Sequence, residues 1–194
     1  MPGTLKLKSE AGGSVILAAN TTAVSDLTVT VPAAAGTMMV SPQLLTIPNV
    51  SGTAMVSGNM PAFSAYKSGN QSFSGSTWTK GTFTLEEYDT NSNFDTTNSR
   101  FLPTVAGYYQ ISCNGYLNAA SDAYMQLYKN GTGLSPAFYT NAGFSFTFFH
   151  LTLSNLIYLN GSTDYLELWF YSNAASPVLS ASGSHFQGIL VRSA

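Results

Sequence analysis

Short alternations of apolar and polar residues run through this chain from one end to the other. Leu27, Val29 and Val31 alternate with threonines, as expected for a strand with one buried face. Beyond residue 60 the same pattern, with turns rich in Gly, Asn and Ser between strands, predicts seven strands and no helix. The predicted strands span residues 62–66, 77–85, 107–118, 123–128, 145–153, 165–172 and 185–191. We therefore predict an all-β fold, a sandwich or jelly roll.

Several of these strands are apolar on both faces. In 145–153, Phe146 and Phe148 lie on the face opposite Phe149, and in 165–172, Trp169 and Tyr171 lie opposite three further apolar residues. A sandwich core covers one face only, and exposing the other would cost several kcal/mol at ~25 cal/mol per Å² of apolar area. We expect a homotrimer to supply the second cover, the alternative being a monomer with scattered exposed aromatics. The predicted interface or core residues are Tyr108, Tyr109, Phe146, Phe148, Phe149, Trp169, Tyr171 and Phe186.

The first sixty residues form a separate segment with an internal repeat. The pattern (V/I)-P-x-x-x-G-T-x-M-V-S occurs at 31–41 and again at 47–57. A strand plus a Pro/Gly turn of this length cannot bury its own apolar face, so it needs neighbouring repeats or other chains. We interpret 1–60 as a short-strand β-repeat that anchors or forms a shaft, and 61–194 as a knob. The repeat positions assigned to the anchor are Val31, Pro32, Gly36, Ile47, Pro48 and Gly52.

Two resemblances add to this interpretation. The order N-x-x-F-D at 91–95 and F-x-P-x-x-x-G-x-Y at 101–109 resembles the signature of the complement C1q-type domain, a jelly-roll trimer related to tumour necrosis factor. Three further segments resemble the family's first strand, its mid-domain hairpin and its closing strand, and they occur in the same order, at 61–65, 127–131 and 186–190. The chain departs from the family before the penultimate strand, where the usual Gly-Asp is stretched to G-S-T-D at 161–164. The opening carries G-x-L-x-L at 3–7, G-G-S-V-x-L at 12–17 and L-T-V-T-V-P-A-A-A-G-T-M at 27–38. This order resembles a segment found near the N-termini of tailed-bacteriophage virion proteins. Together they imply a virion protein with a trimeric C1q-like knob.

Composition excludes several classes of function. Charged residues make up 8% of the chain and the net charge is −2, without a basic cluster that would attract nucleic acid. No export signal is visible, and the most apolar window, 142–159, is interrupted by polar residues, so we expect no membrane span. The one cysteine, Cys113, alternates with apolar residues and is interpreted as a core residue.

Candidate chemistry is sparse. His150 and His185 lack any metal-binding or catalytic spacing, and no nucleophile or phosphate-binding motif appears, so we expect no enzyme and no cofactor. The acidic group Glu86, Glu87, Asp89 and Asp95 fails the EF-hand pattern, because Phe94 replaces the required glycine. Some relatives of the resembled fold bind calcium at loops near the trimer apex, so a calcium site at these loops stays open beside a solvated turn.

These observations lead to one hypothesis with two alternatives. The chain is interpreted as a bacteriophage virion protein, a short homotrimeric head fibre, tail appendage or decoration protein anchored by its N-terminus to capsid or tail proteins. The first alternative is a receptor-binding fibre that recognises host surface carbohydrate; the second, an enzyme acting on polysaccharide, lacks a readable acid pair. The aromatic residues able to stack on sugars, or else to pack in the core or interface, are Trp78, Tyr108, Tyr109, Tyr124, Tyr128 and Trp169.

Overall fold

The computed structural model describes residues 4–8, 14–18, 60–118, 122–134, 138–141 and 149–194. The chain divides into two compact units, Met1–Val50 and Ser51–Ala194, which are treated separately here. In the first unit, β1 (Thr4–Lys8) pairs antiparallel with β2 (Ser14–Ala18). These strands match the alternating segments at the start of the sequence, whereas 27–31 and both repeats lie outside the described residues.

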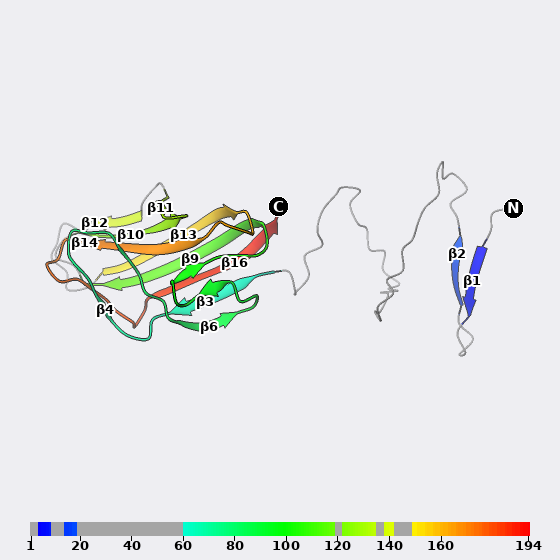
Figure 1. The fold of residues 1–194 in the computed structure, drawn as a ribbon, viewed down its shortest axis with the longest axis horizontal. Helices are drawn as coiled ribbons and strands as arrows, with labels where there is room; N and C mark the ends of the chain where they lie inside the picture. The colour runs from blue at the N-terminus through cyan, green and yellow to red at the C-terminus, as the bar shows by residue number, and fades with distance from the viewer. Residues whose placement is uncertain (1–3, 9–13, 19–59, 119–121, 135–137, 142–148) are drawn as a thin grey trace. The chain divides into compact units, whose positions relative to one another are not determined.

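The second unit, the knob, is a sandwich of two antiparallel sheets, each of seven strands among the residues described (Figure 1). We name the sheets after their central strands, β9 and β10. The β9 sheet contains β3 (Ala62–Tyr66), β4 (Gln71–Ser72), β6 (Leu85–Asp89), β9 (Gly107–Leu117), β13 (Phe149–Leu159), β15 (Val178–Leu179) and β16 (His185–Ser193). The β10 sheet contains β5 (Thr79–Lys80), β7 (Phe94–Asp95), β8 (Arg100–Phe101), β10 (Asp122–Lys129), β11 (Thr132–Gly133), β12 (Phe138–Asn141) and β14 (Leu166–Ser172). The predicted all-β fold is confirmed.

Strand alternation builds the core between the sheets. Tyr109, Ile111 and Cys113 point inward from β9, and the residues between them point outward. From the facing sheet, Leu168 and Phe170 of β14 are buried to the same degree. Close approach across the core requires glycine at one point, because a Cβ on Gly115 would lie 2.4 Å from the Phe170 ring. Eight aromatic rings of the described residues pack in this core among a larger number of leucine and isoleucine side chains.

The predicted strand 77–85 is wrong in its middle. The structure has the short strand β5 and then an irregular stretch before β6. Here backbone groups bond to side chains instead of a neighbouring strand: Lys67 Nζ donates to the Thr82 carbonyl at 2.7 Å, and the Phe83 amide donates to Ser99 Oγ at 2.9 Å. Side-chain partners of this kind satisfy the backbone as well as a ladder does, so the apolar alternation alone misplaced the strand.

An acidic side chain holds the first turn of the stretch 88–111 in place. The Asp89 carboxylate accepts hydrogen bonds from the amides of Phe94 (2.7 Å) and Asn91 (3.3 Å), which folds the chain back into β7. Gly107 then opens β9, where a Cβ would lie 2.3 Å from the Arg192 carbonyl oxygen. This glycine is therefore required by a close backbone approach.

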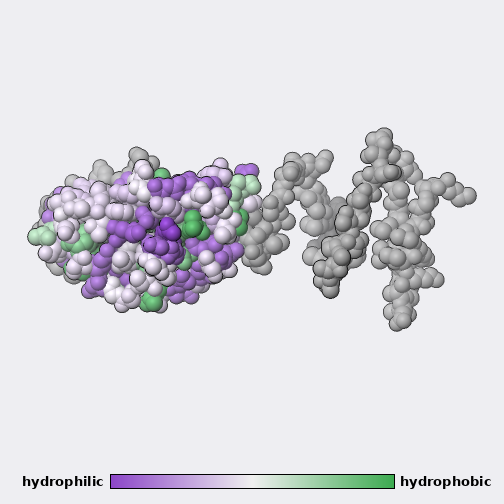
Figure 2. Space-filling view, in the orientation of Figure 1, coloured by the Kyte–Doolittle hydropathy of each residue, from purple (hydrophilic) through white to green (hydrophobic). Residues whose placement is uncertain are grey.

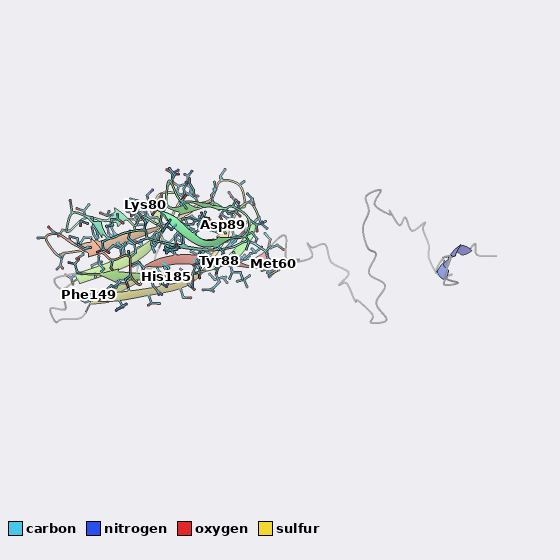
Figure 3. All side chains as sticks on the ribbon, turned by 90° about the horizontal axis from the view of Figure 1, so that it is seen from below. Met60, Lys80, Tyr88, Asp89, Phe149 and His185 are labelled. Atoms are coloured by element: carbon cyan, nitrogen blue, oxygen red, sulfur yellow. The ribbon has the colours of Figure 1, made fainter. Side chains whose placement is uncertain are left out.

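The entry to the knob and its C-terminus lie at one end of the sandwich. The Leu190 amide donates to the Pro61 carbonyl at 2.9 Å, and the Ala194 amide donates to the Ala106 carbonyl at 3.0 Å. Figure 3 places Met60 at this end and Phe149 at the opposite one. The far end is consequently the one that an N-terminal attachment leaves free.

The stretched loop before β14 is ordered by a buried carboxylate. Asp164 is 8% exposed; it pairs with Lys129 Nζ at 2.8 Å and accepts from Asn130 Nδ2 at 2.8 Å and from the Asn160 amide at 3.0 Å. Hydrogen bonds from Lys129 and Asn130 outweigh burial and hold the pKa of the Asp164 carboxyl below its ordinary value. The loop that departs from the C1q-like signature is thus closed by its own polar network.

Asp164→Asn is expected to destabilise the knob by about 1 to 3 kcal/mol at neutral pH, because it removes a charge-assisted pair with Lys129. A carboxyl whose pKa is lowered on folding contributes stability that is present above its unfolded value of 3.8 and lost as pH falls through the folded value. Urea denaturation from pH 7 to pH 2 should therefore show the two proteins converging in acid. Ser162→Ala, in the same loop but not ionisable, serves as the control. A difference between wild type and Asp164→Asn that does not change with pH would contradict this account.

Candidate functional site

The outward face of the β9 sheet carries a group of uncovered apolar side chains. Every exposed large hydrophobic side chain of those residues lies on a strand of this sheet, with exposed fractions between 40% for Tyr66 and 57% for Val191. Isolated exposed apolar residues are ordinary, but a group confined to one sheet marks an interaction surface. The members of this apolar face are Tyr66, Leu85, Tyr88, Tyr108, Leu156, Tyr158, Ile189 and Val191.

Strand register brings these side chains together. Tyr108 pairs with Tyr158, and their ring centroids are 5.4 Å apart. Gln110 of β9 lies between Leu156 of β13 and Ile189 of β16, so the three side chains share the outward face. In the orientation of Figure 2, in contrast, the visible surface of the knob is mainly hydrophilic, with small separate hydrophobic patches. The apolar side chains are thus concentrated rather than spread evenly.

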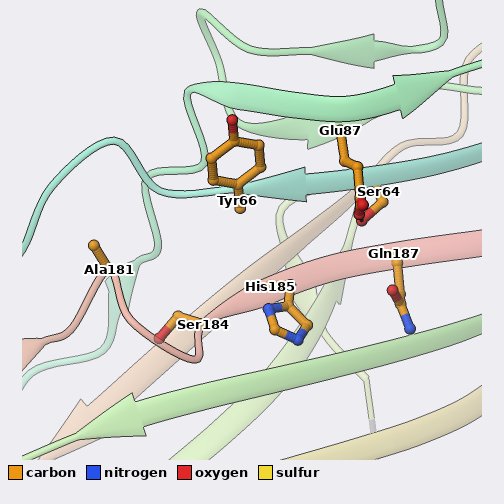
Figure 4. Close-up of a pocket in the computed structure, with 7 residues that line it drawn as sticks. All are labelled: Ser64, Tyr66, Glu87, Ala181, Ser184, His185 and Gln187. Atoms are coloured by element: carbon orange, nitrogen blue, oxygen red, sulfur yellow. Dashed lines mark hydrogen bonds between the residues drawn. The ribbon is translucent and has the colours of Figure 1, made fainter.

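A pocket of about 440 Å³ opens beside this face (Figure 4). Ser64 and Tyr66 reach it from β3, Glu87 from β6, and His185 and Gln187 from β16. The Ser64 hydroxyl donates to Glu87 Oε2 at 3.3 Å. The arrangement supplies hydroxyl, carboxylate, imidazole and amide groups that can form hydrogen bonds with a ligand.

Both histidines also lie on the outward face of the β9 sheet. His150 pairs with Tyr116 in the ladder, and the two rings stack at a centroid distance of 4.3 Å. His185 is half-buried in the pocket and pairs with Asn114. The predicted interpretation as structural or surface residues agrees with these positions.

The four acidic residues singled out in the sequence do not converge. Asp89 closes the turn described above, while Asp95 accepts from Asn98 and pairs with Arg100 at 3.2 Å. The Asn98 hydrogen bonds are the main cause of the lowered pKa of the Asp95 carboxyl. Burial, followed by the charge of Asp89, raises the pKa of Glu86. In the part of the chain that the structure describes, no three His, Cys, Asp or Glu side chains form a group that could hold a metal ion.

The predicted interface or core residues fall into different places. Tyr109, Phe149 and Phe186 are core residues, exposed by at most 4%, and the Tyr109 hydroxyl donates to the Val105 carbonyl at 2.7 Å. Tyr109 is therefore inaccessible to a sugar. Tyr108 belongs to the apolar face, whereas Trp169 and Tyr171 lie on the outward face of the other sheet. Phe146, Phe148 and the repeat positions Val31, Pro32, Gly36, Ile47, Pro48 and Gly52 lie outside the described residues.

The outward face of the β10 sheet carries a second surface, which we call the aromatic cluster. It consists of Trp78, Tyr124, Tyr128, Trp169 and Tyr171, all half-buried. Alternation in β10 and β14 places the last four on one face, which the sequence pattern could have shown. Their contact with Trp78, which precedes β5, depends on the path of the chain and was not predicted.

Comparison with solved structures identifies the architecture. The globular domain of zebrafish complement 1qA protein has a TM-score of 0.51 and 17% identity, covering 69% of this chain and 98% of that one. Murine APRIL (0.54, 9%) covers 68% and 99%, and the PRD1 vertex protein P5 (0.50, 18%) covers 68% and 97%. No protein-family model and no curated protein sequence matches the chain. The knob thus has the jelly-roll fold of C1q and tumour necrosis factor, and identities this low show the fold alone.

The neighbours bear on function only broadly. The complement, tumour-necrosis-factor and APRIL structures are binding or structural domains rather than enzymes. Among the residues that the structure describes, no helix is long and apolar enough to cross a membrane. The functional argument therefore depends on the two surfaces of this chain.

Cys113 is expected to be chemically inert in the native protein. It is 2% exposed, and burial raises the pKa of its thiol well above the ordinary value, so almost no thiolate forms at pH 8. A disulfide reagent such as dithionitrobenzoate should react with less than about a tenth of the thiol in native protein and with all of it in 6 M guanidinium. Rapid labelling of native protein at pH 8 would show that β9 is more accessible than its position in the core implies.

Proposed function

We propose that this chain is a virion structural protein of a bacteriophage, a short homotrimeric fibre or decoration protein whose N-terminal repeat attaches to the capsid or tail. The observation that carries the proposal is the apolar face of the β9 sheet, which a single knob leaves in water. Support for a virion setting comes from the phage-like opening segment, the repeat at 31–41 and 47–57, and the likeness to the PRD1 vertex protein P5.

Association of three copies accounts for the apolar face. Tyr66, Tyr108 and Ile189 lie on strands at the centre of the sheet, so copies meeting there bury aromatic and aliphatic surface together. At ~25 cal/mol per Å², removing such a face from water stabilises an assembly by several kcal/mol per subunit. A closed ring of identical subunits, rather than an open chain of contacts, keeps the assembly finite.

The position of the knob's ends suits attachment through the N-terminus. Met60 leads into β3 at the same end as Ala194, and Phe149 lies at the opposite end. An attachment through residues 1–60 consequently leaves the Phe149 end of the knob pointing outward.

Ile189→Lys and Leu156→Lys are each expected to convert the full chain from trimer to monomer, because a charged ammonium placed in an apolar interface stays unpaired. Light scattering at micromolar concentration should give three times 20.6 kDa for the wild type and 20.6 kDa for the variants. Thr97→Lys, on the exposed turn between β7 and β8, is the matched control and should remain trimeric. A monomeric wild type, or trimeric variants, would refute the assignment of this face.

If residues 1–60 are the anchor, substitutions in the repeat should remove attachment to particles without dissociating the trimer. Replacing Gly36 and Gly52 by valine in the full chain should remove the protein from purified particles, because the repeat turns place glycine at the same position in both copies. The soluble variant should keep the molar mass of the trimer. Quantitative mass spectrometry of particles provides the measurement, with Ser9→Ala as a control substitution outside the repeats. Undiminished incorporation would mean that attachment depends on other residues.

A receptor-binding fibre is the second candidate, and the aromatic cluster favours it. The two candidates differ in a simple assay: soluble protein competes with adsorption only if the knob binds the host. A structural decoration protein leaves adsorption unchanged and lowers particle stability when it is absent. No enzymatic activity is proposed, because the sequence carries no catalytic motif that identifies a reaction.

A further inference from the structure

The aromatic cluster brings five rings from three chain segments onto one sheet face. Trp78 is central: its ring centroid lies 5.7 Å from that of Tyr171 and 6.3 Å from those of Tyr124 and Tyr128. Tyr124 and Tyr171 are 5.3 Å apart, and Tyr128 stacks on Trp169 at 4.5 Å with 20° between the ring planes. None of the five belongs to the core between the sheets, so their contacts with one another lie on the outer surface of the sheet.

Hydrogen-bonding groups border the rings. The Glu167 carboxylate, on a residue 7% exposed, accepts from Trp169 Nε1 at 3.1 Å and from Lys80 Nζ at 2.9 Å. Gln126 lies in register between Tyr124 and Tyr128, and its amide donates to the Leu134 carbonyl, which leaves its oxygen as an acceptor. The hydroxyls of Tyr128 and Tyr171 make no hydrogen bond with any described residue, so they are available to a ligand.

The cations of this sheet are all paired on the strands that the structure describes. Each cation on strands of the β10 sheet is paired with a carboxylate: Lys80 with Glu167, Arg100 with Asp95, and Lys129 with Asp164. An anionic ligand would meet no unpaired positive group on these strands. The charges on these strands therefore argue against an anionic ligand.

The cluster also differs in composition from the apolar face of the β9 sheet. The exposed aliphatic residues Leu85, Leu156, Ile189 and Val191 all belong to the β9 sheet, and no exposed large aliphatic side chain among the described residues lies on the β10 sheet. A protein interface of ordinary size mixes aliphatic and aromatic groups over about 800 Å² per partner. Rings bordered by hydroxyl, amide and carboxylate groups match a smaller ligand with apolar C–H faces and many hydroxyls.

We propose that the aromatic cluster binds the uncharged pyranose rings of a carbohydrate, stacking them on Trp78 and its tyrosine neighbours. Sugar hydroxyls then exchange hydrogen bonds with Tyr128, Tyr171 and Gln126. The inference rests on the proposed function in one respect: association through the β9 sheet leaves the β10 sheet accessible on the outside of the trimer. It deepens the receptor-binding candidate by naming the surface and the class of ligand.

The cluster contains its own reporter. The chain has two tryptophans, Trp78 and Trp169, and both belong to the cluster, so intrinsic tryptophan emission reports this surface alone. Full-length protein is titrated with uncharged tetrasaccharides (cellotetraose, maltotetraose, laminaritetraose and the N-acetylglucosamine tetramer) and with an acidic one, tetragalacturonate. We expect a saturable emission change for at least one uncharged sugar, with a dissociation constant on the order of 1 mM or tighter.

Substitutions locate the binding. Tyr171→Ala retains both tryptophans and Trp78→Ala retains one, and each is expected to weaken binding about tenfold or more by removing a stacking surface. Tyr165→Ala is the matched control: its ring contacts Arg100, with the guanidinium 5.2 Å from the centroid, and lies outside the cluster. It should bind like the wild type. Equilibrium dialysis with labelled sugar gives a second readout that does not depend on emission.

Three outcomes would overturn the inference: no saturable change with any uncharged tetrasaccharide up to about 10 mM, binding of tetragalacturonate alone, or binding that survives Tyr171→Ala and Trp78→Ala in folded protein. Quenching by particles that lack this chain, without any sugar response, would reassign the cluster to a protein partner and overturn it as well. Molar mass and particle association are measured on the same samples. A trimer that binds particles but no sugar refutes this inference alone, whereas a monomer refutes the proposed function.

Discussion

A strand has two faces and a two-layer sandwich buries only one of them, and this constraint governs the whole knob. Inward residues such as Tyr109, Ile111 and Phe170 fill the space between the sheets. Several outward residues of the same strands, among them Tyr108 and Trp169, are also aromatic, although polar residues such as Gln110 lie between them. What the knob does therefore follows from what covers its two outer faces.

The two outer faces differ in the side chains that they expose. On the β9 sheet, Leu156, Ile189 and Val191 are among the most exposed apolar side chains, and water is a poor environment for them. On the β10 sheet, Trp78 and the tyrosines shield one another, and hydroxyl and carboxylate groups surround them. The first face gains most from another copy of the chain, while the second can stay in water and still offer rings to a ligand. The proposed trimerisation and the proposed ligand binding therefore use different faces of one small domain.

At the ends of several strands, polar side chains form the hydrogen bonds that backbone groups of a neighbouring strand would otherwise form. Asp89 closes the turn before β7, Ser99 bonds both backbone groups of Phe83, and Asp164 orders the loop before β14. Lys67, 3% exposed, holds the Thr82 carbonyl, and burial lowers the pKa of its ammonium to about 8. With few charged residues in the chain, several of those present serve the fold directly. The low charge content is consistent with a protein whose surfaces meet other proteins and neutral ligands.

The sequence by itself determined the all-β class, most of the long strands, the core role of Cys113, and the C1q-like order of motifs, because side-chain alternation and turn residues act over a few neighbouring positions. It predicted an apolar outer face but could not say which residues form it: Tyr109 and Phe186 proved to be core, and Leu156, Tyr158 and Ile189 were not named. The irregular stretch after β5, the pocket at His185 and the contact of Trp78 with Tyr171 were decided by the tertiary structure alone. They depend on contacts between segments up to about a hundred residues apart, whose partners no local pattern specifies.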